Sequence, residues 1–377
     1  MVNAPRIGFI GWNPFQFLHI KRLAQALEGA CFIIEKRKEF ISDFSSEILE
    51  CEDIPIMIWD RAKMPSLDGV FDIIVCQTPF FRIEEFEKTK IAMIQYGYAK
   101  EPHNYGAWRS LADVCMTYGP YATQKISSFA PSVSVGNPRY DIWASEEFHS
   151  IAKKTHGSNL DPSKKTVLYL PTWGDLSSVD QYLDSVYSLA EEYNVILKMH
   201  HNTELLESDR KKRVTDGEVI HYGANDDLLA LLSVCDLVIS DYSGAIFDAI
   251  YCKKPVVLLN TNLDEQLGGK KIDEYSLEYS RRDELGYVVK SPEELFLVIS
   301  VALTESNLHS KTSKNLREEL FLDTTNATEI AVNVLNGLHK NEYIPSQSQA
   351  YIRSEIKELL RTKRQLAIAN KKLKEGK

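Results

Sequence analysis

Short apolar runs alternate with segments of helical spacing along the N-terminal part of the chain. The spacing of Leu18, Leu23 and Leu27 after Gly11 predicts a helix. The apolar runs predict buried strands at Arg6–Ile10, Ala30–Ile34, Ile54–Ile58, Phe71–Cys76, Ile91–Ile94, Met116–Pro120 and Val133–Gly136. Continuous apolar strands are typical of parallel sheets that helices cover on both faces.

A polar segment rich in turn-forming residues, His156–Lys165, is the predicted linker to a second series. This series predicts strands at Thr166–Leu170, Val195–Met199, Glu218–His221, Leu237–Ser240, Pro255–Leu259 and Tyr287–Val289. It predicts helices at Asp180–Glu192, Asp226–Val234, Gly244–Tyr251 and Pro292–Leu303. Strands that alternate with helices indicate doubly wound α/β domains. We therefore expect two Rossmann-like domains facing a cleft, at residues 1–155 and 156–335.

The last segment, residues 340–377, differs in charge from the rest. It holds ten Lys or Arg against four Glu, a net charge of +6 that leaves −15 on the rest of the chain. A short heptad seam is visible at Ile352, Ile356, Leu359, Lys363, Leu366, Asn370 and Leu373. Three interpretations stay open: a solvated amphipathic helix, a weak coiled coil that makes a homodimer, and a basic helix on an anionic membrane surface.

The composition is that of a soluble globular protein: of 377 residues, 44% are apolar and 26% are charged. The formal charge of −9 argues against a nucleic-acid partner. The six cysteines form no CxxC pair, and none has His neighbours at metal-ligand spacing, so we expect free thiols in a reducing cytosol and no metal. No apolar run reaches the roughly 18 residues of a membrane span, and no signal peptide is evident. The expected location is cytoplasmic, with a peripheral place on the inner face of the membrane left open.

The string from Leu237 to Asp248 is the strongest candidate for a binding site. A strand ends at Ser240-Asp241, and a turn of small residues leads through Ser243 and Gly244 into a helix. Free backbone N–H groups and hydroxyls at such a helix start can hold a phosphate. The alternative is an ordinary helix cap, with Asp241 or Ser243 as the capping residue and no ligand.

Two further strands of the second series end in candidate side chains. His200 and His201 follow the strand VILKM, and a histidine there could bind phosphate or protonate a leaving oxygen. Adjacent side chains are expected to point in different directions, so His200 alone is the candidate; an exposed loop histidine is the alternative. Thr172 could donate to a phosphate, and Trp173 could stack on a base or be core.

In the first series, the loop that follows Ile91–Ile94 carries Tyr96, Glu101 and His103. His103 or Glu101 could act as a general base, whereas Tyr96 titrates near 10 and suits a hydrogen-bond donor better. The alternative is a surface loop that packs its tyrosines. Arg139, after the last strand, could bind an anionic group, or its segment could be a hinge between domains.

Five strings, VGNPRYD, YLPTW, VILKMH, DLVISDYSGAIFD and KPVVLLN, occur in that order. They resemble the GPRxD, YxPTW, HP, SDYSS-xxFD and KP segments of the CDP-glycerol glycerophosphotransferases, which prime and polymerise teichoic acids and whose relatives build phosphate-linked capsules. The resemblance covers about Ile91 to Leu335. It implies a GT-B fold and transfer of glycerol phosphate or ribitol phosphate from a CDP-alditol to an acceptor hydroxyl, with release of CMP. The implied acceptor is a polymer or is lipid-linked.

The resemblance also assigns residues. His200 stands at the family's histidine, and Ser240 and Ser243 at its phosphate-binding serines, with Gly244 in place of a usual Ser. The family's His-Gly-Thr-Pro, whose His is the proposed base, is replaced here by Tyr96-Gly97-Tyr98-Ala99. His201 stands where the family usually has Pro.

No Walker motif or carboxylate cluster suggests a metal or other cofactor. The residues leave three other functions open. One is a GT-B glycosyltransferase with a nucleotide-sugar donor, since the same helix start binds any diphosphate. Another is a UDP-sugar 2-epimerase, which has a similar turn. The third is an inactive subunit that binds a polymerase through the tail.

Overall fold

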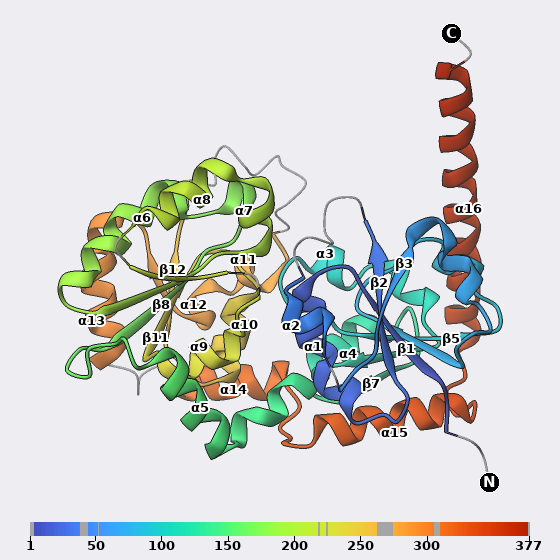
Figure 1. Ribbon diagram of the computed structural model, residues 1–377, viewed down its shortest axis with the longest axis horizontal. Coiled ribbons are helices and arrows are strands. Elements are labelled where there is room, and N and C mark those ends of the chain that lie inside the picture. Colours follow the sequence, from blue (N-terminus) through green and yellow to red (C-terminus); the bar gives the residue numbers. More distant parts are fainter. Residues whose placement is uncertain are drawn as a thin grey trace. The chain divides into compact units, whose positions relative to one another are not determined.

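The computed structural model describes residues 4–37, 44–51, 53–217, 219–223, 225–261, 274–304 and 310–375. The chain divides into two compact units (Figure 1). The first unit comprises Met1–Tyr96, Tyr105–Asp141 and Leu322–Lys377, and the second comprises Gly97–Asn104 and Ile142–Phe321.

The first unit is built on a 7-stranded parallel sheet with the strand order β3-β2-β1-β4-β5-β6-β7. This order is that of a Rossmann sheet with one more strand at its edge. The predicted strands of the first series are confirmed, with end shifts of a few residues. They are β1 (Ile7–Gly11), β2 (Cys31–Lys36), β3 (Ile56–Asp60), β4 (Ile73–Cys76), β5 (Lys90–Ile94), β6 (Val114–Thr117) and β7 (Ser132–Ser134).

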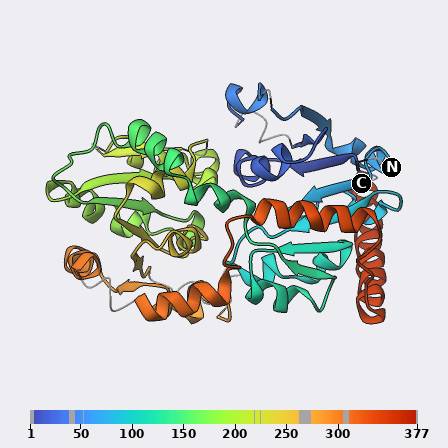
Figure 2. The same ribbon diagram turned by 90° about the horizontal axis from the view of Figure 1, so that it is seen from below.

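The helices of this unit include one from the far end of the chain. The helix after β1 begins at Pro14, and Asn13 caps it, because the Asn13 side chain accepts the Gln16 N–H. Helix α15 lies across the sheet and contacts α1, β5 and β6 (Figure 2). The helices are α1 (Pro14–Gln25), α2 (Ser46–Leu49), α4 (Pro120–Ile126), α15 (Ala327–His339) and α16 (Gln347–Glu375), with 3₁₀ turns η3 (Ile83–Glu85) and η4 (Ala107–Leu111).

The second unit is built on a 6-stranded parallel sheet with the order β10-β9-β8-β11-β12-β13. Its strands agree with the predicted ones, although Glu218, the expected start of β10, lies outside the described residues. They are β8 (Thr166–Leu170), β9 (Asn194–Lys198), β10 (Ile220–Tyr222), β11 (Leu237–Ser240), β12 (Val256–Leu259) and β13 (Tyr287–Val289).

One face of this sheet forms a buried cluster in which Tyr169, Leu197 and Ile239 pack against α6, α8 and α13. In addition, α9 contacts β8, and α10 contacts β11 and β12. The helices of the second unit are α3 (Glu101–Asn104), α5 (Glu146–His156), α6 (Val179–Ser188), α7 (His201–Leu206), α8 (Ser208–Thr215), α9 (Leu228–Val234), α10 (Ala245–Tyr251), α11 (Leu277–Ser280), α12 (Arg282–Leu285), α13 (Leu295–Thr304) and α14 (Ser310–Leu320).

The division into units differs from the predicted ranges 1–155 and 156–335. The chain enters the second unit after Asp141, ahead of α5, and returns to the first unit at Leu322. Helix α5 belongs to the second unit because it packs on α9. The carboxylate of Asp141 accepts the Ala327 N–H (2.8 Å) and the Thr328 N–H (2.7 Å), which holds the start of α15 in the first unit.

Residues Gly97–Asn104, expected in the N-terminal domain, also belong to the second unit. Tyr98 is buried there between the rings of Phe247 and Phe321, at centroid distances of 5.2 and 5.1 Å. Its hydroxyl donates to the carbonyl of Leu320. This aromatic anchor explains why the segment leaves the unit that contains β5.

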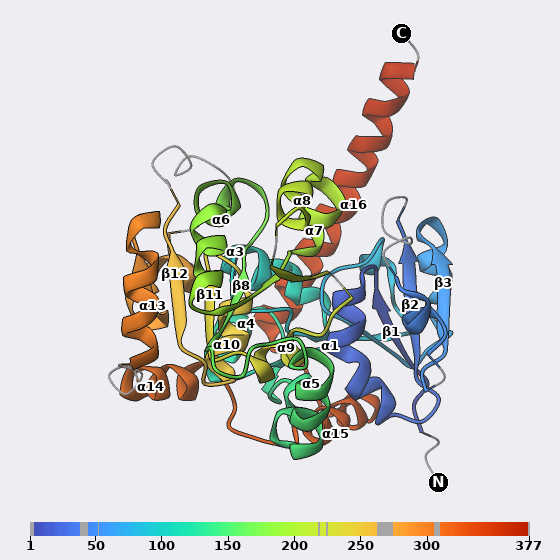
Figure 3. The ribbon, with the colours of Figure 1, turned by 60° about the vertical axis from the view of Figure 1, so that its left-hand side comes forward.

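The predicted C-terminal tail is a helix, α16, and its first half is docked on the first unit. Arg353 pairs with Asp113 (2.7 Å), and Arg364 pairs with Glu84 and Glu85. Beyond Arg364 the side chains are exposed, and the last turns extend away from the sheet of that unit (Figures 1 and 3). The predicted seam is therefore split: its first two positions are partly covered by the unit, and its later leucines are exposed.

Candidate active site

The turn between β11 and α10 is held by the buried carboxylate of Asp241. It accepts the backbone N–H groups of Thr172 (2.9 Å) and Ser178 (2.9 Å), and the Ser178 hydroxyl (2.8 Å). Burial raises the pKa of Asp241, and these hydrogen bonds offset only part of that effect. Asp241 thus joins the loop after β8 to the turn after β11. Both of its oxygens accept from protein donors in this structure, and its predicted contact with a ligand stays a prediction.

The two serines of the turn differ in what their hydroxyls do. The Ser240 hydroxyl donates to the carbonyl of Leu170 at 2.6 Å and is fully buried, so in this structure its proton is used within the protein. The Ser243 hydroxyl accepts the Ala245 N–H at 3.3 Å, which leaves its own O–H able to donate. A side chain at Gly244 would meet only Ala99, at 3.8 Å. Asp248 is buried on α10.

The end of β8 carries Thr172 and Trp173. Thr172 donates its backbone N–H to Asp241, while its hydroxyl makes no hydrogen bond within the described residues. Trp173 lies nearly parallel to the ring of His200, with 6.1 Å between centroids. Because β8 lies between β9 and β11 in the sheet, Thr172, His200 and Ser243 follow the carboxyl ends of three neighbouring strands.

His200 caps α7, because its Nδ1 accepts the Asn202 N–H at 3.1 Å. Burial lowers its pKa well below the ordinary value, and the charges of His201, Lys100 and Lys198 lower it further. The unliganded ring is therefore neutral, and since Nδ1 accepts, its proton sits on Nε2 as a donor.

The expectation that the two histidine rings point in different directions is wrong. The rings of His200 and His201 stack with 4.3 Å between centroids and 28° between planes. Burial lowers the pKa of His201 to about 4. Both rings are therefore neutral at pH 7 in the absence of an anion.

The segment Gly97–Asn104 brings two predicted residues to this unit. The Glu101 carboxylate accepts the Leu277 N–H at 3.2 Å, and its backbone N–H donates to Ser276 at 3.1 Å. Glu101 is buried and holds the start of α11, so its side chain does not present a free base. His103 is exposed on α3, in the same unit as His200.

Two residues that the sequence did not single out brace this edge of the sheet. The Arg282 guanidinium donates to the carbonyls of Asp241 (2.9 Å) and Leu259 (3.0 Å) and lies 4.2 Å from the centre of the Tyr242 ring. Glu278 accepts the Lys100 N–H at 2.7 Å, and burial raises the pKa of its carboxyl to about 7. Neither lies in a recognisable motif, and both act through contacts between distant segments.

Arg139 and Tyr96 belong to the first unit, and the turn after β11 belongs to the second. Arg139 is buried and contacts Nε2 of His19 at 2.9 Å, and its predicted binding of an anionic group stays a prediction. Burial lowers the pKa of His19 well below its ordinary value, and the charge of Arg139 adds to that effect. Burial raises the pKa of Tyr96 to about 12, so its hydroxyl stays protonated, as a donor role requires.

The structure also bears on the cysteines, on metal binding and on membrane-spanning helices. The six cysteines are free thiols. In the described part of the chain, no group of three or more His, Cys, Asp or Glu residues could hold a metal ion. Among the described helices, none combines the length and the apolar character that crossing a membrane requires.

Comparison with known sequences gives a family match. The model of the family described as CDP-Glycerol:Poly(glycerophosphate) glycerophosphotransferase matches residues 126–330, more than half of the chain. The teichoic acid poly(glycerol phosphate) polymerase of Bacillus subtilis strain 168 is 29% identical over 182 residues, which are 43% of this chain and 22% of that protein. The polymerase of the same name from Bacillus spizizenii is 33% identical over 141 residues, 33% of this chain and 34% of that protein. The matched segments thus cover between about a fifth and about a third of the length of these relatives.

Comparison with solved structures gives the fold. A structure of the wall teichoic acid polymerase TagF aligns with a TM-score of 0.63 at 17% identity and covers 89% of each chain. This likeness confirms the predicted fold class, GT-B with two Rossmann-like α/β domains.

Proposed function

Because this chain belongs to the CDP-glycerol:poly(glycerophosphate) glycerophosphotransferase family, we propose that it transfers glycerol phosphate or ribitol phosphate from a CDP-alditol to an acceptor hydroxyl. CMP is the second product, and the acceptor belongs to a cell-surface polymer, a teichoic acid or a capsule. The observation that carries the proposal is that the matched residues 126–330 include both His200 and the turn at Ser243. These follow β9 and β11, which flank β8 in one sheet.

The donor's diphosphate is proposed to bind at the carboxyl ends of β8, β9 and β11. Thr172 and Ser243 each have a hydroxyl donor for it, Gly244 leaves space for close approach, and His200 supplies its Nε2–H. Asp248 stays a proposed donor-site residue on α10. Asp241 and Ser240 support this site through the protein contacts described above, without touching the donor.

The chemistry is a phosphoryl transfer without a covalent enzyme intermediate. The acceptor oxygen forms a bond to the phosphorus that carries the alditol, the bond from that phosphorus to the CMP oxygen breaks, and the hydroxyl proton passes to a base. A bound diphosphate raises the pKa of the neutral His200, so the ring can stabilise or protonate the departing phosphate. Positioning and fixed hydrogen-bond donors account for most of the rate gain.

The proposed base is His103. It is exposed on the segment Gly97–Asn104, which belongs to the same unit as the proposed donor site. Glu101 is less suited to be the base because its carboxylate accepts the Leu277 N–H. Tyr96 is less suited because its hydroxyl stays protonated. Tyr96 would instead donate a hydrogen bond to the acceptor.

The experiment that tests the function is a donor screen with the full chain and a polymer acceptor. CDP-glycerol and CDP-ribitol are compared with UDP-glucose and UDP-N-acetylglucosamine, and CMP and UDP are quantified. We expect acceptor-dependent CMP release from one of the CDP-alditols. UDP release, or epimerisation of the UDP-sugar, would assign one of the nucleotide-sugar functions instead. Turnover of none of the four would favour an inactive subunit.

We propose further that the chain acts in the cytoplasm, peripherally at the inner face of the membrane, where a lipid-linked acceptor would be found. The support is the exposed end of α16, which carries Lys371, Lys372 and Lys374 next to Leu366 and Leu373. Each basic residue close to an anionic surface contributes about 1 kcal/mol, less at high salt. A homodimer formed through the same leucines is the competing use of this helix.

A further inference from the structure

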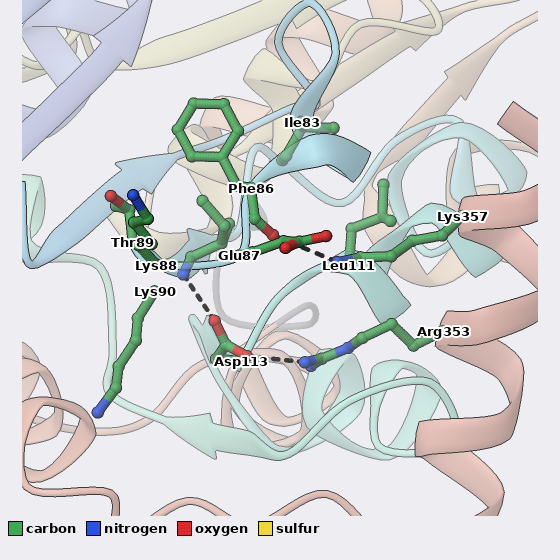
Figure 4. A pocket seen from close by; sticks show the side chains of 11 residues that line it. Ile83, Phe86, Glu87, Lys88, Thr89, Lys90, Leu111, Asp113, Arg353 and Lys357 are labelled. Carbon is green, nitrogen blue, oxygen red and sulfur yellow. Dashed lines mark hydrogen bonds and ion pairs between the residues drawn. The ribbon is translucent and has the colours of Figure 1, made fainter. Parts of the chain in front are cut away.

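The first unit contains a cavity of about 380 Å³ at the edge of its sheet opposite the carboxyl ends (Figure 4). Lys357 and Arg353 of α16 line one side of it. The segment Glu87–Ile91, at the start of β5, and Asp113, just before β6, line the other. Substrates of open parallel sheets bind at the carboxyl ends of the strands, so this cavity at the amino ends has another purpose.

The cation at its wall is Lys357, which is partly buried. Its Nζ lies 3.3 Å from the carbonyl of Phe86, and no carboxylate of the described residues lies within 4.0 Å of it. Burial is the largest cause that lowers the pKa of Lys357; the charges of Arg353 and Arg361 also lower it, and those of Asp113 and Glu87 raise it. A bound anion would favour the charged form of Lys357 and so oppose this lowering of its pKa.

Arg353 adds donors to the same cavity. Three of its N–H groups are used: they donate to the carbonyls of Ser110 (2.7 Å) and Ala112, and to the carboxylate of Asp113 (2.7 Å). A guanidinium has five N–H bonds, so two have no acceptor within the part of the chain that the structure describes.

The remaining charges leave the cavity cationic. Lys90 lines it, but its Nζ turns away to the carbonyls of Leu338 and His339. Lys88 and Glu87 are both exposed at the rim. Asp113 is occupied by Arg353 and by the Ile91 N–H at 2.8 Å. With the ammonium of Lys90 turned away, three cations, Lys357, Arg353 and Lys88, remain at the cavity against two carboxylates, Glu87 and Asp113, and Asp113 is already engaged.

We propose that this cavity binds a phosphate group, with Lys357 and the two remaining N–H bonds of Arg353 as its partners and Lys88 at the rim. A tetrahedral oxyanion accepts several hydrogen bonds at once, which suits a guanidinium edge beside an ammonium. The phosphate is that of a soluble phosphate ester or of a lipid headgroup. The site does not depend on the proposed transfer reaction, since none of its residues belongs to the candidate active site.

The test is a calorimetric titration of the full chain with inorganic phosphate and with glycerol phosphate at low ionic strength. Lys357→Gln should weaken binding about ten-fold or more, because one hydrogen bond to a charged group is lost. Lys363→Gln is the matched control: it removes the same charge from an exposed position of α16 and should leave affinity unchanged. Glu87→Gln should strengthen binding, since it removes a rim carboxylate.

Two vesicle compositions then separate the sources. If Lys357→Gln lowers sedimentation with vesicles of phosphatidylglycerol and phosphatidylcholine, but not with phosphatidylcholine alone, the phosphate is that of a headgroup. If only the soluble ligands respond to the substitution, the source is a soluble ester.

Two results would overturn the proposal. If Lys357→Gln lowers the melting temperature, while neither it nor the exposed Lys88→Gln changes phosphate affinity, the cations serve only to dock α16. Absence of measurable phosphate binding to the unmodified chain has the same meaning.

Discussion

The backbone N–H of Lys100 donates to the carboxylate of Glu278 at 2.7 Å, across a sequence separation of 178 residues. Lys100 has a left-handed φ of 59°, a conformation that side-chain-bearing residues rarely adopt. The second oxygen of Glu278, Oε2, is buried without a hydrogen-bond partner in the described structure. Ionised Glu278 is therefore poorly compensated, which explains the direction of its pKa change.

Glu278→Gln should change how stability depends on pH. The folded-state pKa of Glu278, about 7, lies above its ordinary value of 4.5, so the folded protein holds this proton more tightly than the unfolded chain. The stabilisation of the folded state that comes from this tighter proton binding is therefore lost as pH rises from about 4.5 to 7, on the order of 3 kcal/mol in total. Gln keeps an oxygen for the Lys100 N–H but does not ionise. Thermal unfolding from pH 5 to 8 should show the variant gaining stability relative to the original chain, and a constant difference would contradict the assignment.

Ser243→Ala should weaken binding of the CDP-alditol by about 1.5–3 kcal/mol, the cost of one hydrogen bond to a charged group, without unfolding the protein. Ser240→Ala is the matched control, because its hydroxyl donates to the Leu170 carbonyl and reaches no ligand. That variant should lose about 1–3 kcal/mol of stability and keep its donor affinity. Calorimetric titration with the donor measures both. Equal affinity in Ser243→Ala and the original chain would remove the turn from the site.

His200→Ala should lower turnover by orders of magnitude, since it removes the Nε2–H donor from the proposed donor site. It also removes the cap of α7, at a cost of about 1 kcal/mol. His200→Asn is the better probe, because its side-chain oxygen can still accept the Asn202 N–H. Rates of CMP release and melting temperatures are compared for both. Full turnover in either variant would make His200 a structural residue.

His103→Gln should lower turnover by about 10²–10⁴-fold if His103 is the base. His221→Gln, at another exposed position of the same unit, should leave the rate of CMP release unchanged. Glu101→Gln should mainly lower stability, because Glu101 holds the start of α11. An unchanged rate in His103→Gln would place the base elsewhere.

Truncation of the chain after Arg364 should weaken binding to vesicles that contain phosphatidylglycerol, most clearly at low salt, while activity on a soluble acceptor persists. The cut is placed there because Arg353 and Arg364 dock the first half of α16, and removing them would disturb the first unit. A double variant, Lys372→Gln with Lys374→Gln, removes charge but keeps the exposed leucines. If both proteins still bind vesicles, and the truncation alone converts a dimer to a monomer, α16 is an oligomerisation helix.

Local pattern was enough to predict the strands and to select the residues of the candidate site. Buried parallel strands are continuous apolar runs, and Thr166–Leu170, Leu237–Ser240 and Tyr287–Val289 have the ends that the pattern predicts. Ligands bind where such strands end, so the residues that follow the strands, among them Thr172, His200 and Ser243, are the binding-site candidates. Three of the strings that resemble the family, YLPTW, VILKMH and DLVISDYSGAIFD, contain these three residues, and the family match includes all five strings.

The roles of individual side chains were harder to predict, because a role depends on which distant group each one meets. Asp241 was expected at a ligand, and it binds the N–H groups of Thr172 and Ser178, more than 60 residues away. Ser240 was expected to donate a hydrogen bond to a phosphate, and its hydroxyl donates to the Leu170 carbonyl of the adjacent strand. Arg282 and Glu278 carry no motif, since their function is to connect segments that only folding brings together.

The sequence by itself therefore determined the two series of strands and helices, the fold class and the family, because these follow from periodicity and from short contiguous strings. Only the tertiary structure decided that Gly97–Asn104 belongs to the second unit, through the burial of Tyr98 between Phe247 and Phe321. It also decided that α16 docks on the first unit, through Arg364 and a glutamate 280 residues away. The physical reason is the same in both cases: burial and ion pairing are set by neighbours in space, and a linear pattern contains no information about which distant neighbours those will be.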